Sequence, residues 1–102
     1  LTNDPAEGVQ DADVVVTAVW NTAAPGTRES EERLREFAGY QLTGSLLQGA
    51  KPDHMVLHCL PARRGEEIST AVFESHADEI FTEAENRLHV QKAVLAILLA
   101  GK

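Results

Sequence analysis

The sequence predicts an α/β fold that is part of a doubly wound parallel sheet with helices on both faces. Two short apolar runs, residues 13–17 and 54–58, lack polar alternation, so we expect strands that are buried on both sides. A third strand is expected at residues 79–81. Helical segments separate these three strands, and such crossovers join parallel neighbours. Three strands are few for this type of sheet, so the chain is expected to be one part of a larger domain.

The first third of the chain carries two helix signals. Asp4 can cap a first helical turn, and Pro5 suits the first helical position. Ser30 is expected to cap a longer helix, which follows a loop containing Pro-Gly. Gly39 is expected to end that helix.

Three further helices are expected in the rest of the chain. A short one begins after Thr43, and a second spans about residues 69–74. The last runs from about residue 85 to residue 99 and is the clearest helix in the sequence. Its buried face is expected to hold three apolar residues: Val94, Ile97 and Leu98.

Composition narrows the possible partners and the cellular location. The 102 residues carry a net charge of −7, and the largest basic cluster is Arg63–Arg64, so no nucleic acid is expected as a partner. Cys59 is the single cysteine, which excludes an internal disulfide and favours the cytoplasm. The longest apolar stretch, residues 93–100, is too short to cross a bilayer, so no membrane partner is expected.

Ligand binding is expected at the carboxyl ends of the strands, because open α/β sheets bind ligands in the crevice beyond those ends. Residues 18–23 follow the first expected strand, residues 58–61 the second, and residues 82–87 the third. Each segment contains side chains that are unusual in a plain connection. The three segments are therefore expected to converge on one edge of the sheet.

Cys59 has two possible roles. It can be a small buried apolar residue, or its thiol can face a substrate at the strand end. Pro61 favours the second role, because a cis X-Pro bond would fix the neighbouring carbonyls in unusual directions. His58 precedes the cysteine on an extended chain, so the two side chains point to opposite faces and cannot form a nucleophilic pair. The charged loop 63–67 is expected to be solvated or to close over a ligand.

Arg87 also has two possible roles. It can be a surface arginine paired with Glu83 or Glu85, or it can bind an anion at the start of the last helix. Asn86 is expected to cap that helix. The four histidines have no metal-ligand spacing with Cys59, so no metal site is expected.

Two motifs resemble segments of ornithine carbamoyltransferases. Residues 58–62, His-Cys-Leu-Pro-Ala, are followed by Arg-Gly-Glu-Glu at 64–67, and residues 83–89 read Glu-Ala-Glu-Asn-Arg-Leu-His. Both motifs are similar to the corresponding family segments, and further matches extend over nearly the whole chain. Aspartate carbamoyltransferases typically have proline where Cys59 stands, so the cysteine favours the ornithine branch.

The resemblance implies transfer of a carbamoyl group from carbamoyl phosphate to the side-chain amine of ornithine, a step of arginine biosynthesis that gives citrulline and phosphate. It implies that Cys59 is catalytic and binds substrate, that Leu60 offers its backbone carbonyl to the substrate, and that Arg87 contacts carbamoyl phosphate. Thr22 and Ala23 stand where family members bind the ends of ornithine. The resemblance implies no cofactor.

The resemblance also implies that residues 1–102 are part of the carboxyl-terminal, amine-substrate-binding domain of a trimeric enzyme. The amino-terminal carbamoyl-phosphate domain is then absent from this chain, which alone is expected to be inactive. Ala18 stands where the family usually has aspartate, and residues 22–26 replace the family's Ser-Met-Gly segment. Two alternatives therefore remain open, namely a carbamoyltransferase for a different amine and a non-catalytic ligand-binding remnant.

Overall fold

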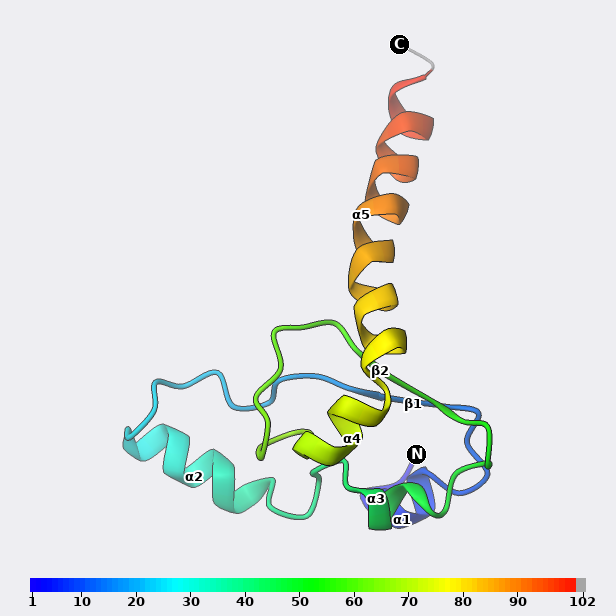
Figure 1. Ribbon diagram of the computed structural model, residues 1–102. Helices are drawn as coiled ribbons and strands as arrows, with labels where there is room; N and C mark the ends of the chain where they lie inside the picture. Colours follow the sequence, from blue (N-terminus) through cyan, green and yellow to red (C-terminus); the bar gives the residue numbers. More distant parts are fainter. Residues whose placement is uncertain (101–102) are drawn as a thin grey trace.

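Residues 1–100, which the computed structural model describes, form five helices and two strands (Figure 1). Gly101 and Lys102, the last two residues of the expected domain, lie outside this range. The elements follow one another in this order: α1 Pro5–Gly8, β1 Val14–Thr17, α2 Arg28–Glu36, α3 Gly44–Leu47, β2 Met55–His58, α4 Thr70–Ser75 and α5 Ala77–Leu99.

The two strands form a parallel pair, as predicted for residues 13–17 and 54–58. Their register runs from Val14 opposite Met55 to Thr17 opposite His58. Because both strands point the same way, the segments that follow them leave the sheet at the same edge.

The two faces of this sheet differ in burial. Val15 and Val56 point into the core, and Val56 is completely buried. Val14, Val16 and Met55 on the other face are 45%, 65% and 42% exposed. The prediction that the strands are buried on both sides is therefore wrong for the described residues, and that of helices on both faces is met only in part.

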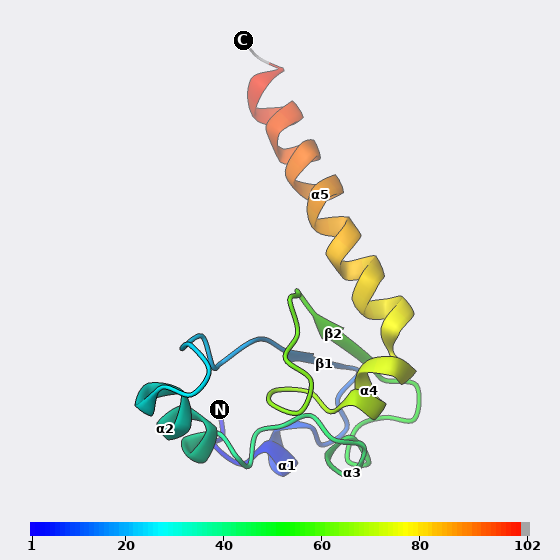
Figure 2. The same cartoon turned by 60° about the vertical axis from the view of Figure 1, so that its left-hand side comes forward.

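The core lies between the buried face of the sheet and the short helices, which Figure 2 shows beneath the strands. Helix α5 contributes through its first turns only. Nine buried apolar residues make up this core: Val9, Val15, Leu42, Leu47, Val56, Ile68, Val72, Phe73 and Ile80.

Side-chain caps set the starts of four helices. Asp4, Thr43 and Ser69 each accept a hydrogen bond from a backbone N–H of the first turn, and the cap at Asp4 is the one that the sequence predicts. The prediction that Ser30 caps α2 is wrong, because Thr27 accepts the capping hydrogen bond from the N–H of Ser30 at 3.2 Å. The cap of the longer helix therefore lies three residues before the predicted one.

The expected third strand does not form, because residues 79–81 belong to α5. The segment from residue 77 to residue 99 contains neither glycine nor proline, so nothing in it interrupts a helix. Ile80 is completely buried in the core. The carboxylate of Glu79 accepts a hydrogen bond from the backbone N–H of Val56 at 2.9 Å, and this ties the first turn of α5 to β2.

The last helix differs from its prediction in start and in burial. It begins at Ala77 rather than near residue 85, so Asn86 is not a helix cap and Arg87 lies in mid-helix. Its carboxyl-terminal half leaves the rest of the molecule as a single rod (Figure 1). The expected buried face is exposed, because 43%, 75% and 66% of the surface is accessible at Val94, Ile97 and Leu98. No helix among the described residues is long and apolar enough to cross a membrane.

Candidate active site

A pocket of about 450 Å³ lies where the two strands end. Two of the three predicted segments, residues 18–23 and 58–61, meet in it. Ala23 is buried and is not among the lining residues. The lining residues are Ala18, Val19, Thr22, Cys59, Leu60, Pro61 and Arg63.

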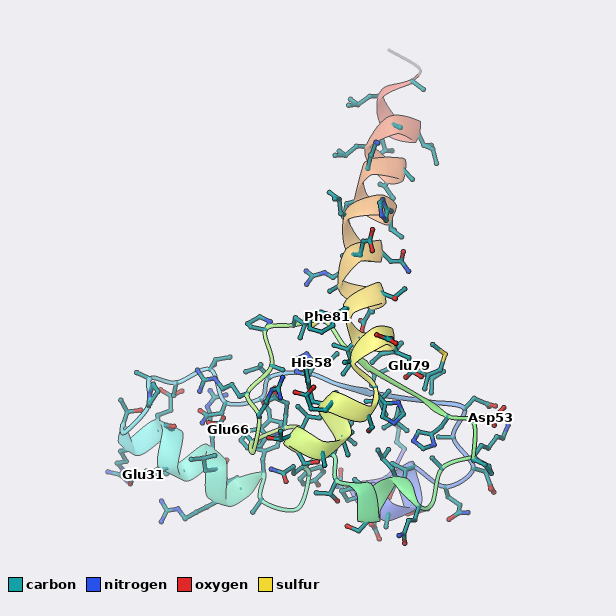
Figure 3. The ribbon with its side chains drawn as sticks, viewed as in Figure 1. Glu31, Asp53, His58, Glu66, Glu79 and Phe81 are labelled. Carbon is teal, nitrogen blue, oxygen red and sulfur yellow. The ribbon has the colours of Figure 1, made fainter. Side chains whose placement is uncertain are left out.

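Cys59 is exposed, so its interpretation as a buried apolar residue is wrong. His58 is completely buried, as expected for neighbours that point to opposite faces of an extended chain. Figure 3 shows the His58 side chain inside the molecule, whereas Asp53 lies at the other end of β2. The Leu60–Pro61 bond is cis, and Leu60 has a φ of 54°, a backbone conformation that is uncommon for residues other than glycine.

The guanidinium of Arg87 lies close to this loop. Its Nη1 donates a hydrogen bond to the backbone carbonyl of Cys59 at 2.9 Å. The predicted pairing with Glu83 or Glu85 is wrong, because no such ion pair occurs within residues 1–100. A hydrogen bond to a neutral carbonyl leaves the positive charge without a carboxylate partner. Arg87 is therefore a cation beside the pocket, although it is not among the lining residues.

Helix α2 holds the segment that carries Thr22. The Asn21 side chain is completely buried and donates from Nδ2 to the hydroxyl of Ser30 at 3.0 Å. Arg33 donates from Nη1 to the backbone carbonyl of Trp20 at 3.0 Å. These two hydrogen bonds hold Trp20 and Asn21 against α2, and the next residue, Thr22, remains exposed at the pocket.

A buried pair of side chains supports the loop after β2. His58 and Glu67 are both completely buried, and His58 Nε2 lies 2.8 Å from Glu67 Oε1. The N–H of Leu60 donates to His58 Nδ1 at 2.8 Å, so this nitrogen carries no proton and Nε2–H donates to the carboxylate. Glu67 Oε1 also accepts from the N–H of Arg63 at 2.6 Å. The pair therefore holds two backbone positions of the pocket lining.

The role of Glu67 is missing from the sequence prediction, which places residues 63–67 in a solvated or closing loop. The available signal is weak: the glutamate directly precedes Ile68, which is also completely buried. No group of three or more His, Cys, Asp or Glu side chains within residues 1–100 is placed to hold a metal ion.

Comparisons with known proteins agree with this geometry. Residues 1–98 match the family model described as aspartate/ornithine carbamoyltransferase, Asp/Orn binding domain. The ornithine carbamoyltransferase of Geobacter metallireducens is 56% identical over 101 residues, which cover 97% of this chain and 32% of that protein.

Two solved structures have the same arrangement. The anabolic ornithine carbamoyltransferase of Campylobacter jejuni matches with a TM-score of 0.87 at 42% identity, over 97% of this chain and 32% of that one. The ornithine carbamoyltransferase of Pyrococcus furiosus matches with a TM-score of 0.87 at 46% identity, over 97% and 31%. The chain spans about a third of the length of these relatives.

Proposed function

Because the chain belongs to the aspartate/ornithine carbamoyltransferase family, we propose that it is the amine-binding part of a longer carbamoyltransferase. The reaction moves a carbamoyl group from carbamoyl phosphate to the side-chain amine of ornithine and gives citrulline and phosphate. One observation carries this proposal: Thr22, Cys59 and Leu60 line a single pocket, and Arg87 is hydrogen-bonded to the loop that forms it.

Each site residue has a role that its chemistry suits. Cys59 is the catalytic residue, and its exposed thiol lies beside the attacking amine. The carbonyl of Leu60 orients the carbamoyl NH2 group. Arg87 binds carbamoyl phosphate, since a guanidinium neutralises the charge that develops on a leaving phosphate. Thr22 contacts the acceptor, and Ala23 places the backbone of the same segment against it.

The longer polypeptide supplies the rest of the site. A separate domain binds the phosphate of carbamoyl phosphate, and the complete sheet is doubly wound. The active enzyme is a cytoplasmic homotrimer with sites shared between subunits. Its role is anabolic, as the names of two relatives, from Campylobacter jejuni and Pyrococcus furiosus, say of those proteins.

Citrulline formation by the full-length polypeptide that contains this chain tests the proposal. We expect turnover with carbamoyl phosphate and ornithine, and a loss of roughly 10²-fold in kcat for Cys59→Ala. Because the thiol is exposed, this variant should keep its stability within about 0.5 kcal/mol of wild type.

Arg87→Ala should weaken the binding of carbamoyl phosphate in isothermal titration. A polypeptide that binds carbamoyl phosphate but carbamoylates no amine would be a non-catalytic remnant, and the proposal would be wrong.

A different acceptor amine is the second candidate, and one observation favours it. The pocket lining includes no carboxylate that would hold the α-ammonium group of ornithine.

A further inference from the structure

We infer that His58 is a positioning residue for the carbamoyl transfer and that it acts through one of its two ring nitrogens. Its Nδ1 accepts the N–H of Leu60 and thereby keeps the carbonyl of Leu60 turned toward the substrate. This inference rests on the proposed function and adds a residue to the same site. It follows from the way in which one peptide unit, the one between Cys59 and Leu60, is held at both ends.

The peptide unit between Cys59 and Leu60 has a hydrogen bond on each side. Its carbonyl accepts from Nη1 of Arg87 at 2.9 Å, and its N–H donates to Nδ1 of His58 at 2.8 Å. Because a peptide unit is planar, two bonds on opposite sides of it resist rotation of the whole plane. The next carbonyl, that of Leu60, accepts no hydrogen bond from residues 1–100, so it is available to a ligand.

The backbone of Leu60 shows why such a restraint is needed. Its φ of 54° lies in the left-handed region, which residues other than glycine rarely adopt. A half-turn of the preceding peptide plane would bring this φ back to a common value, as in the change from a type II to a type I turn. The same rotation would move the part of the loop that lines the pocket. The observed conformation of Leu60 therefore persists only while the peptide is held.

Of the two hydrogen bonds, the one to His58 does not depend on the substrate. Arg87 is the proposed ligand of carbamoyl phosphate, and a guanidinium that turns to a phosphate shares or gives up its bond to the Cys59 carbonyl. The His58 side chain is completely buried inside the molecule (Figure 3) and is not part of the pocket lining. It therefore holds the peptide throughout the reaction.

Glu67 determines which nitrogen of His58 carries the proton. Its carboxylate oxygen Oε1 lies 2.8 Å from Nε2 and accepts a hydrogen bond from Nε2–H. A neutral imidazole has one donor and one acceptor, so a proton on Nε2 leaves the lone pair of Nδ1 for the N–H of Leu60. A proton on Nδ1 would instead place one donor against another. The tautomer that Glu67 selects is thus the one that positions Leu60.

Two substitutions at His58 separate the roles of its two nitrogens. The Oδ1 atom of asparagine lies near the place of Nδ1, so His58→Asn keeps an acceptor for Leu60 but is too short to reach Glu67. The amide nitrogen of glutamine lies near the place of Nε2, so His58→Gln keeps a donor to Glu67 but offers no acceptor to Leu60.

The test measures kcat, the KM for ornithine and the urea midpoint of both variants in the full-length polypeptide that contains this chain. We expect His58→Gln to lower kcat about 10²-fold, because the reacting groups are misaligned. Its KM should change less than about threefold, since alignment acts on the transition state. His58→Asn should lose less than about tenfold in kcat. It should nevertheless be the less stable variant, because the buried Glu67 carboxylate loses its donor.

A merely structural role would make turnover follow stability, whereas the inference predicts the opposite order. An equal or larger loss of kcat in His58→Asn would overturn the inference and leave the proposed function intact, and so would wild-type kcat in His58→Gln. If neither variant folds, NMR of the wild-type imidazole nitrogens decides: a proton on Nδ1 contradicts the inference, and an unprotonated Nδ1 supports it. No citrulline from the wild-type polypeptide would overturn the proposed function itself.

Discussion

Among single residues, His58 and Glu67 hold the pocket loop in place, because they accept hydrogen bonds from two of its backbone N–H groups. The sequence predicts that His58 and Cys59 point in opposite directions, since this follows from the geometry of any extended chain. It does not predict that Glu67 is buried, because this burial depends on the path of the loop between His58 and Glu67. A run of charged residues looks the same whether its last member is solvated or enclosed.

Removing the Glu67 carboxylate should destabilise the fold far more than removing its neighbour. Glu67→Ala leaves the buried His58 Nε2–H and the N–H of Arg63 without their acceptor, so we expect a loss of about 3 kcal/mol in the free energy of unfolding. Glu66→Ala should cost less than about 0.5 kcal/mol, because Glu66 is half-buried in a long ion pair. Urea denaturation of both variants measures the difference. Equal losses would mean that the buried pair has no special role in stability.

At the scale of elements, the local sequence predicts helix starts, because these depend on hydrogen bonds between residues that are close in the sequence. The cap at Asp4 and the approximate starts of the helices at Thr43 and Ser69 are predicted, because each of these residues bonds to its own first turn. The third strand fails because the short segment Glu-Ile-Phe at residues 79–81 fits a strand and a helix equally well. What decides is tertiary contact: Ile80 enters the core, and Glu79 bonds to β2.

The tie between α5 and β2 should depend on pH. Partial burial acts to raise the pKa of Glu79, but the hydrogen bond from Val56 and the contact with His76 lower it by more, so the pKa lies below its usual 4.5. A carboxyl whose folded pKa is lowered stabilises the fold above the unfolded value. This stability is lost as the pH falls through 4.5 and then through the lower folded pKa.

Glu79→Gln should therefore flatten the acid side of the stability profile. We expect the urea midpoint of the wild-type chain to fall between about pH 6 and about pH 3, and the variant to fall less. Glu31→Gln is the control, because Glu31 is exposed on α2 away from the strands (Figure 3). The explanation fails if both variants follow the wild-type profile.

At the scale of the whole molecule, burial is uneven. The core gathers around the two strands and the short helices, whereas all residues from 85 to 100 are exposed. The sequence predicts a helix with apolar residues at the end of the chain but cannot show what covers those residues. Relatives that are about three times as long have further chain available for that purpose.

The rate of amide hydrogen exchange should differ between the core and the exposed part of α5. In the 102-residue chain, we expect amides of residues 88–99 to exchange roughly two orders of magnitude faster than those of β2 and α4, because a helix without tertiary contacts opens on its own. Hydrogen–deuterium exchange followed by mass spectrometry measures the ratio. The full-length polypeptide provides the comparison, since coverage of α5 there should slow its exchange. Equal protection of α5 and β2 in the short chain would contradict the expectation.

Because α5 projects as a single rod, a small change in its angle to the core produces a large displacement of its carboxyl-terminal end. Twenty-three residues at about 1.5 Å each give a lever of about 35 Å. A tilt of about 10° at the joint would swing the tip by about 6 Å for that length. A pair of spin labels, one near the tip and one on α2, would convert a small angular change at Glu79 into a measurable displacement.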